Sequence, residues 1–398
     1  MFSVVSEQSP APVSVANGTE PREVVYIGYV GGLGGEANQL FDLAAGVASR
    51  GVAVTVVVPD LPGTRRMAAE YEQANLRVVL SPLIRFDQPG GQKFSDVWKL
   101  HRAFRAPVVH LHTGDICVPR VNLLVLMLQR GFNVFATIHS AYPDMAVGGS
   151  RARLWAQAVR SRFSRIICPS GHGRDAQIAY GLPPARVQTV YNAIDTPRFA
   201  QGDGQQARAA LNVGPDVPLV IATARLHPQK RPLDSVDAFA RIAPDFPDVR
   251  LVLVGNGPLE AEVRARIAGH GLESRVNLMG HQQNVPDWLA AADVWLCTSD
   301  AENFSLSVLE AMAAGCAIVG TFCRGNDEIL KNGENALTAP VGDINELAAG
   351  LRRLLITREL RMRLQAGARE TVTHFDRERM IDRHLELYRG NSAATQKL

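Results

Sequence analysis

The chain has 398 residues, 46% of them hydrophobic and 20% charged, which is the composition of an ordinary globular protein. Its length exceeds that of a typical single core, so two domains are expected. The formal net charge of +3 is close to neutral and gives no reason to expect a nucleic-acid partner. The sequence has no run of about 18 apolar residues, so no membrane-spanning helix is expected.

Residues 1–22 are polar and rich in Ser, Pro and Ala. They lack a basic start followed by an apolar core, so they are predicted to be a disordered tail and not a signal peptide. The cysteines show no metal-ligand spacing, which favours reduced, buried thiols in a cytoplasmic protein. They are Cys117, Cys168, Cys297, Cys316 and Cys323.

From residue 24 onward, short apolar segments alternate with longer amphipathic ones. Strands that are apolar on both faces and separated by helices predict a parallel sheet covered on both sides. The strands expected in the first half are 24–30, 52–58, 108–112, 133–139, 165–169 and 187–191, and those in the second half are 219–224, 250–255, 275–280, 293–298 and 316–321.

A glycine-rich stretch follows the first strand and opens a helix, with Gly31, Gly32, Gly34 and Gly35. Glycines let backbone amides approach a ligand, and a helix N-terminus attracts an anion. Residues 32–37 also satisfy the loose dinucleotide fingerprint, and Asp60 ends the second strand where a ribose-binding acid would lie. A nicotinamide-dependent oxidoreductase, or glycines that serve only a tight turn, are therefore alternatives.

Three histidines lie at strand ends of the first half: His110, His112 and His139. His110 and His112 point to the same face of a strand, but no third ligand has suitable spacing, so a zinc site is not expected. His139 opens an irregular loop, where it is a candidate donor lining a cleft, and a structural role is the alternative.

A basic segment occupies residues 151–165. A basic amphipathic helix can lie on anionic lipid, which makes peripheral contact with the inner face of a membrane a hypothesis; a solvated outer face is the alternative. The segment has no acidic residue and holds Arg151, Arg153, Arg160, Arg162, Arg165, Trp155 and Phe163.

The alternation of strands and helices breaks once, at the polar stretch 196–208. We therefore predict a first domain over 23–200 and a second over 205–374. A final helix at about 375–390 is a candidate to pack back onto the first domain. Two doubly wound domains in tandem would face a central cleft, lined by the loops at the carboxyl ends of the strands.

Two cations follow the first strand of the second domain, in "ARLHPQKRP" (224–232). Arg225 and Lys230 are expected in a strand-to-helix loop beside a helix N-terminus. This placement suits a diphosphate, above all one that leaves with growing negative charge. Solvated surface charge is the alternative.

The stretch "NFSLSVLEAMAAGCAIVGTFC" (303–323) is predicted to be a buried helix followed by a buried strand, with Glu310 as its single charge. Buried carboxylates are rare unless they are paired. Ser305 is a candidate N-cap, so the amides that follow it would face the same opening as Glu302. Carboxylates at these two places can accept hydrogen bonds from vicinal hydroxyls of a ribose or another sugar.

Together these motifs resemble the family 4 retaining glycosyltransferases, over about residues 24–390. The most specific match is "AENFSLSVLEAMAAG" (301–315), which is similar to the E-x(7)-E element of the family. "VYNAIDTPRF" (190–199), "ARLHPQK" and "VGNGP" (254–258) match further motifs in the same order. Ser305 and Ser307 depart from the family pattern, in which glycine is usual after Phe304, and Arg324 replaces a common glycine.

The resemblance implies an α/β protein of the GT-B fold, with two Rossmann-like parallel-sheet domains. It implies transfer of a sugar from a nucleotide diphosphate, UDP favoured over GDP, to a hydroxyl acceptor with anomeric configuration retained. No cofactor and no metal are expected. A nucleotide-sugar-binding module without turnover is the main alternative. The sequence leaves the acceptor, the linkage and the oligomeric state open.

The resemblance also assigns roles to individual residues. Arg225 and Lys230 would hold the diphosphate, Glu310 the ribose and Glu302 the donor sugar. Backbone amides of Phe304, Ser305 and Leu306 would add donors near the sugar and phosphate. The glycines Gly31, Gly32, Gly34 and Gly35 would approach the diphosphate from the first domain, and His139 would contact the sugar near its reacting carbon.

Overall fold

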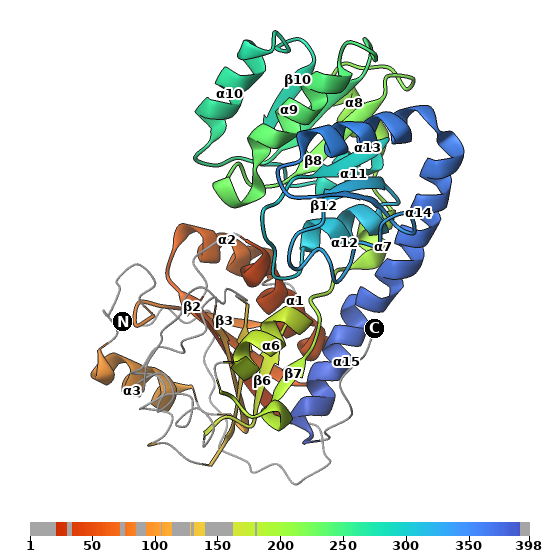
Figure 1. The fold of residues 1–398 in the computed structure, drawn as a ribbon. Coiled ribbons are helices and arrows are strands. Elements are labelled where there is room, and N and C mark those ends of the chain that lie inside the picture. Colours follow the sequence, from red (N-terminus) through yellow and green to blue (C-terminus); the bar gives the residue numbers. More distant parts are fainter. Residues whose placement is uncertain are drawn as a thin grey trace. The chain divides into compact units, whose positions relative to one another are not determined.

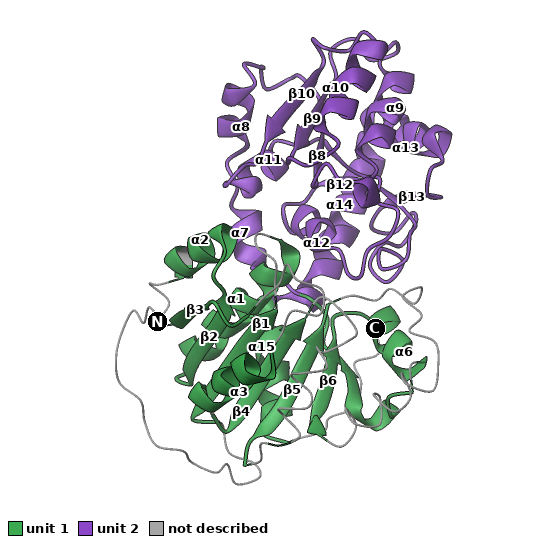
Figure 2. Ribbon diagram, turned by 90° about the vertical axis from the view of Figure 1, so that its left-hand side faces the viewer, with its two compact units in different colours: residues 1–192, 377–398 green, residues 193–376 purple. Residues whose placement is uncertain are grey.

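The computed structural model describes residues 21–29, 34–71, 76–84, 93–104, 106–113, 128, 131–139, 162–179 and 181–390. The chain divides into two compact units, one of residues 1–192 and 377–398 and one of residues 193–376 (Figure 2). The division therefore falls a few residues before the boundary expected at 200–205. Within the described residues, no helix is both long and apolar enough to cross a membrane.

The stretch 196–208 is not the irregular break that its polar composition indicated. It forms two short helices, α7 (Thr196–Ala200) and α8 (Gly204–Ala210), and both belong to the second unit. Asp195 caps α7 by accepting from the amide of Arg198, and Asp203 caps α8 by accepting from the amide of Gln205. These two N-caps are the local signal that overrides the polar, glycine-containing composition.

The sheet of the first unit is fully parallel and has seven strands in the order β3-β2-β1-β4-β5-β6-β7. The third strand, β3, was not expected from the sequence. The strands are β1 (Glu23–Tyr29), β2 (Ala53–Pro59), β3 (Arg77–Ser81), β4 (Val108–Thr113), β5 (Asn133–Ile138), β6 (Arg165–Cys168) and β7 (Val187–Thr189). Helices lie between successive strands in the chain: α1 (Gly35–Ser49), α2 (Pro62–Tyr71), α3 (Phe94–Ala103), α6 (Gly171–Ala179) and the short η2 (Pro184–Arg186).

The last helix within the described residues, α15 (Arg377–Tyr388), returns to the first unit and packs against α1 (Figures 1 and 2). Gly46 makes the close approach possible, because a β-carbon there would overlap the side chain of Ile381. Arg50 forms ion pairs with Glu378 at 2.6 Å and Asp382 at 2.9 Å. A helix remote in sequence therefore completes this unit.

The second unit holds a parallel sheet of six strands in the order β10-β9-β8-β11-β12-β13. The strands are β8 (Leu219–Thr223), β9 (Arg250–Val254), β10 (Val276–Gly280), β11 (Val294–Cys297), β12 (Ala317–Thr321) and β13 (Leu337–Ala339). Its further helices are η3 (Pro228–Lys230), α9 (Pro232–Ile242), α10 (Glu260–Gly269), α11 (Val285–Ala290), α12 (Leu306–Ala313), α13 (Ile344–Ile356), α14 (Arg358–Val372) and η4 (Thr373–Phe375).

The central strands of this sheet are buried on both faces, which explains why β8, β11 and β12 are almost continuously apolar. Val220 and Ala222 of β8 face a core cluster with α9, α10 and α13. Leu219 and Ile221, the alternate residues of the same strand, face a second cluster with α8 and α11. This alternation is the period of two that a strand imposes on its side chains. The two parallel-sheet units confirm the expected α/β architecture.

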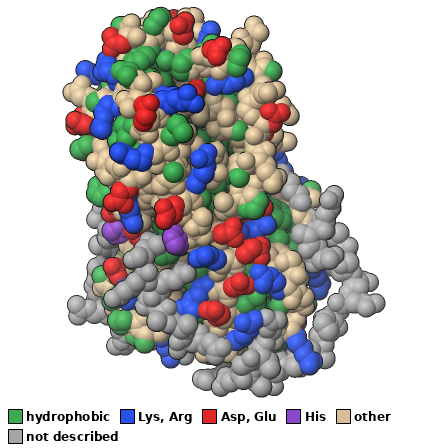
Figure 3. Space-filling view, turned by 90° about the vertical axis from the view of Figure 1, so that its right-hand side faces the viewer, with side chains coloured by type: hydrophobic (Ala, Val, Ile, Leu, Met, Phe, Trp, Pro, Cys, Tyr) green, Lys and Arg blue, Asp and Glu red, His purple; other side chains and the backbone are tan. Residues whose placement is uncertain are grey.

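On the face drawn in Figure 3, Lys and Arg side chains alternate with Asp and Glu, in keeping with a formal net charge of +3. Four of the five cysteines lie in the described residues and are free and buried, as the sequence predicts. Burial raises the pKa of each of these thiols, to about 12 for Cys316 and Cys323, so they are expected to stay protonated.

Candidate active site

The strand order of the second sheet reverses between β8 and β11, which are neighbours in space but not in sequence. In open α/β sheets, ligands bind outside the carboxyl ends of the strands at such a switch point. The loop after β8 carries Arg225 and Lys230, and the loop after β11 carries Glu302. The residues predicted from separate motifs are thus brought to one place in this unit.

The two loops are joined by hydrogen bonds along their length. The amide of Asp300 donates to the carbonyl of Gln229 at 2.8 Å, and the side-chain amide of Gln229 donates to the carbonyl of Ala301 at 2.7 Å. Thr298 donates to the carbonyls of Lys230 and Arg231 at 2.9 and 3.0 Å. These contacts fix the backbone on both sides of the candidate binding residues.

Lys230 and Glu302 form an ion pair at the centre of these loops. Lys230 Nζ lies 2.5 Å from Glu302 Oε1, and the exposed fractions of the two side chains are 16% and 8%. Ser299 Oγ donates to the same carboxylate oxygen at 2.7 Å. The sequence assigned the two residues to different parts of a donor, and it gave no sign that they would bind each other.

The backbone between Lys230 and α9 is unusual. Arg231 has φ 47° and ψ 54°, in the left-handed region that non-glycine residues rarely adopt. Such conformations persist where the surroundings hold them, and they gather at functional sites. The hydrogen bonds from Thr298 hold this turn, and Ser235 Oγ in turn lies 3.0 Å from Thr298 Oγ1. The turn sets the direction from which Lys230 reaches Glu302.

Two glycines bring a third loop against this site. Gly255 and Gly257 belong to the "VGNGP" turn after β9, and a β-carbon at either would overlap the carbonyl oxygen of Ala224 or Leu226, respectively. The amide of Leu226 donates to the carbonyl of Asn256 at 2.9 Å. The glycines of this motif therefore serve close backbone packing beneath the loop that carries Arg225, whose side chain is exposed.

The helix α12 begins beside Glu302. Ser305 occupies the N-cap position, as expected, but its side chain caps no amide and lies 3.2 Å from Ser307 Oγ instead. Phe304 is buried and packs edge-on against Phe375. Leu306 is the first residue of α12, so the amides of residues 304–306 lie where the helix begins.

Glu310 is not buried, contrary to the expectation from its apolar surroundings. Its exposed fraction is intermediate, because the buried face of α12 is formed by other residues, among them Val308, Leu309 and Met312. Glu310 also has a polar partner within the protein. The Glu310 side chain thus lies at the edge of the apolar face, within the first two turns of α12.

In the first unit, the described part of the glycine-rich loop begins at Gly34. Gly34 precedes α1 and Gly35 opens it, whereas Gly31 and Gly32 lie outside the described residues. His139 directly follows β5 and is buried. Its Nε2 atom lies 3.1 Å from Nδ1 of His112, and burial lowers the pKa of His139 to about 4.

The histidines of β4 belong to a buried network of polar side chains. Tyr388 of α15 lies 2.5 Å from His110 Nδ1 and 3.1 Å from the hydroxyl of Tyr26, while His110 Nε2 lies 2.8 Å from Thr137 Oγ1. In the part of the chain that the structure describes, no group of three or more His, Cys, Asp or Glu side chains is arranged to hold a metal ion. Asp60, the acid of the dinucleotide fingerprint, is paired with Arg65 at 2.6 Å.

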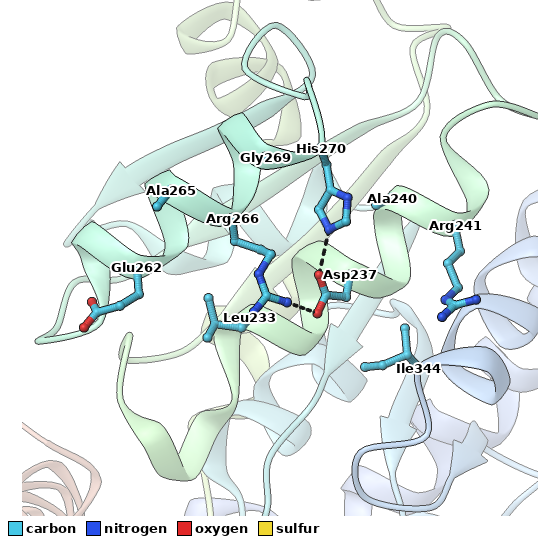
Figure 4. Close-up of a pocket in the computed structure, with 10 residues that line it drawn as sticks. All are labelled: Leu233, Asp237, Ala240, Arg241, Glu262, Ala265, Arg266, Gly269, His270 and Ile344. Carbon is cyan, nitrogen blue, oxygen red and sulfur yellow. Dashed lines mark hydrogen bonds and ion pairs between the residues drawn. The ribbon is translucent and has the colours of Figure 1, made fainter.

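The concavities of the second unit include a small pocket and a wider groove. The small pocket adjoins the ion pair and is lined by Thr223, Lys230, Trp295 and Ser299, among others. The wider groove lies between α9 and α10, where Asp237 binds both Arg266 and His270 (Figure 4). The groove is formed by helix surfaces and has no strand-end loop, so we assign the candidate site to the loops after β8 and β11, which carry Lys230 and Glu302.

Sequence reasoning missed the residues that support this site. Thr298 and Ser299 follow directly after β11, and Gln229 precedes Lys230. Their signal was available, because polar residues directly after an apolar strand face the ligand edge of a parallel sheet. The basic segment 151–165 lies almost entirely outside the described residues, so the membrane hypothesis stays a prediction.

Comparison with solved structures defines the fold class. The Anabaena protein HepE, solved in complex with UDP and glucose, matches with a TM-score of 0.78 at 22% identity, over 92% of this chain and 99% of that one. A glycosyltransferase from Rickettsia africae matches with a TM-score of 0.79 at 15% identity, over 93% and 98%. The fold is GT-B, as the resemblance implied.

Comparison with protein families places the chain more narrowly. Residues 33–198 match the model described as Glycosyltransferase Family 4, and residues 203–371 match the model described as Glycosyl transferases group 1. The chain belongs to this family of glycosyltransferases. The hypothesis of a nicotinamide-dependent oxidoreductase gains no support from these matches.

Curated relatives match over part of their length. N-acetyl-alpha-D-glucosaminyl L-malate synthase of Bacillus anthracis is 32% identical over 207 residues, which are 52% of this chain and 54% of the relative. D-inositol 3-phosphate glycosyltransferase of Geodermatophilus obscurus is 31% identical over 220 residues, 52% of this chain and 48% of the relative. The chain spans about half the length of these two relatives.

Proposed function

We propose that the protein transfers a sugar from a nucleotide diphosphate donor to a hydroxyl group, with the anomeric configuration retained and without a metal ion. The observation that carries the proposal is the joining of Lys230 and Glu302 at the switch point of the second sheet. A cation for the diphosphate and a carboxylate for sugar hydroxyls lie there side by side, on loops fixed by hydrogen bonds.

In this proposal Arg225 and Lys230 neutralise the diphosphate, and the amides at the start of α12 add further donors. Glu302 accepts hydrogen bonds from the donor sugar and Glu310 from the ribose. Gly31, Gly32, Gly34, Gly35 and His139 of the first unit contribute by resemblance to the family. The bond between the anomeric carbon and the phosphate oxygen breaks, and the acceptor oxygen bonds to that carbon on the same face.

The proton of the acceptor hydroxyl passes to an oxygen of the departing diphosphate. The charge that develops on this diphosphate falls on the side of Lys230 and Arg225, which is the kind of stabilisation that needs no bound metal. We favour UDP as the nucleotide, and the UDP bound by HepE makes it the first to test. Small hydroxyl compounds, glycans and lipid-linked sugars are all candidate acceptors.

Thermal-shift screening of UDP- and GDP-sugars tests the donor before any acceptor is known. A stabilising donor is then incubated with the protein, and release of free nucleoside diphosphate is measured with and without candidate acceptors. Slow hydrolysis, or transfer to any acceptor, supports a glycosyltransferase. Binding without turnover under every condition would favour the binding module, and a strict need for added magnesium or manganese would contradict the metal-free mechanism.

A further inference from the structure

The ion pair between Lys230 and Glu302 has a consequence for how the site distinguishes its ligands. Both charges are mostly withdrawn from water, and each is the principal partner of the other. A mostly buried charge that loses its partner is strongly destabilised. A ligand that draws Lys230 away from Glu302 must therefore also supply hydrogen-bond donors to the Glu302 carboxylate. A ligand without such donors binds with lower affinity.

The carboxylate has little alternative support once Lys230 moves. Its Oε1 atom would keep the hydrogen bond from Ser299, at 2.7 Å, and its backbone is held by the bond from its amide to the carbonyl of Arg324, at 2.9 Å. Gly325 packs closely against the carbonyl of Glu302, which leaves the backbone of Glu302 little room to shift toward Gly325. The carboxylate therefore stays near the position that a phosphate bound to Lys230 would approach, and the two negative groups would repel.

A complete donor and a bare nucleoside diphosphate differ in this respect. The complete donor brings an anion for Lys230 and sugar hydroxyls that donate to Glu302. The bare diphosphate brings only the anion, so it exchanges one negative partner of Lys230 for another and leaves Glu302 uncompensated.

We propose that the Lys230–Glu302 pair is an exchange contact, which opens for the complete donor and closes again on the product, so that it weakens binding of the nucleoside diphosphate left after transfer. The proposal rests on the donor roles proposed above. By this proposal Glu302 determines specificity, because it lowers the affinity for the nucleoside diphosphate product and raises the affinity for the complete donor. The contact lies entirely within the second unit, so it needs no particular arrangement of the two units.

The test is the affinity of UDP and GDP for Glu302→Gln, measured by titration calorimetry. Glutamine keeps the shape and the hydrogen bond from Ser299 but releases the charge of Lys230. We expect the better-binding nucleotide to bind about tenfold more tightly to this variant than to the unchanged protein, since a tenfold change is the scale of one relieved charge interaction. A ligand-binding carboxylate with no such competition predicts the opposite, unchanged or weaker binding.

Asp300 provides a matched control two residues away on the same loop. Its side chain is exposed, and Asp300→Asn removes the same charge without touching Lys230. We expect this variant to change UDP and GDP affinity by less than about twofold, the scale of screened surface charge. Melting curves of both variants establish that they are folded.

The outcomes separate this inference from the proposed function. Tighter binding to Glu302→Gln alone supports the exchange contact. Unchanged or weaker binding, or an equal gain in Asp300→Asn, overturns it while the donor site stands. If neither nucleotide binds the unchanged protein or either folded variant, the site is not a uridine or guanosine diphosphate site, and the inference fails together with the proposed donor.

Discussion

Gly325 packs directly against Glu302, and a β-carbon on Gly325 would overlap the carbonyl oxygen of Glu302. Gly325 also has φ +88°, a conformation that favours glycine. We expect Gly325→Ala to lower the free energy of unfolding by about 2–4 kcal/mol, because backbone strain and a backbone clash add. Nucleotide affinity should fall as well, since the loop that carries Glu302 must shift.

Gly333 is the matched control for this substitution. Its φ is +79°, but no heavy atom lies within 4 Å of a β-carbon placed there. Gly333→Ala should therefore show the strain without the clash, about 1 kcal/mol, with nucleotide affinity unchanged. Chemical denaturation measures both variants, and equal losses of stability would show that the contact with Glu302 is unimportant.

Replacing Lys230 with Ala should lower turnover by about 100- to 1000-fold, the scale for removing one electrostatic stabiliser of a developing charge. The structure adds a second expectation, that the ligand-free variant melts earlier, because Glu302 loses its partner. Initial rates at saturating donor and melting curves give the two readouts. Arg241→Ala removes an exposed cation from α9 of the same unit and should alter neither.

Glu310→Gln tests the ribose role. If Glu310 accepts hydrogen bonds from ribose hydroxyls, the loss of its charge should weaken nucleotide binding roughly ten- to a hundredfold, the equivalent of one charged hydrogen bond. Because Glu310 is half-exposed, removal of its charge should change the ligand-free melting temperature little. Calorimetric titration of UDP and GDP decides, and a lower melting temperature with unchanged affinity would assign Glu310 a structural role.

The buried histidines make stability depend on pH. Burial lowers the pKa of His139 and of His384 to about 4, and the pKa values of His110 and His112 are lowered as well. In the unfolded chain these groups titrate near 6.5, so below that pH the unfolded state binds more protons. Stability should therefore be complete above about pH 6.5 and should fall toward pH 4, by up to about 1.4 kcal/mol per pH unit for each histidine.

Urea denaturation at pH 7.5, 6.0 and 5.0 measures this slope. His384→Leu fills a similar volume and removes one of the four buried histidines. The free energy of unfolding of this variant should therefore depend less steeply on pH, by the uptake of about one proton on unfolding. An unchanged slope in the variant would mean that His384 is not neutral in the folded protein.

The contact of Tyr388 with His110 predicts that α15 stabilises the first unit. Tyr388→Phe removes a hydroxyl that lies within hydrogen-bonding distance of both His110 and Tyr26. Leaving buried polar groups unpaired costs about 1–3 kcal/mol each, so melting should occur clearly earlier. Arg379→Ala, an exposed change on the same helix, should leave the melting temperature unaltered.

The parallel architecture could be predicted because buried strands of an α/β sheet are apolar on both faces, and each expected strand is present within a residue or two. The misses have local causes. β13 is only three residues long, so its apolar run is too short to stand out from its neighbours. The polar composition of residues 196–208 indicated a break between domains. Asp195 and Asp203 are N-cap residues, and they were the signal for the two helices α7 and α8 that form there.

The sequence predicted the residues of the candidate site as separate motifs, but not the contacts between them. Sequence spacing placed Arg225 and Lys230 after one strand and Glu302 after another, and the strand order then made those ends adjacent. The pairing of Lys230 with Glu302 joins residues 72 positions apart, and no local pattern encodes such a contact. For the same reason Tyr388 gave no sign of its contact with the histidines of β4.

The return of α15 to the first unit bears on the order in which the protein is made. Residues 21–192 leave the ribosome first, yet the helix that packs on α1 and contacts His110 is made after the whole of the second unit. Residues 193–376 form a compact unit from one continuous segment, so they can fold as soon as they emerge. The first unit is synthesised earlier, but part of its core stays uncovered until α15 has been made.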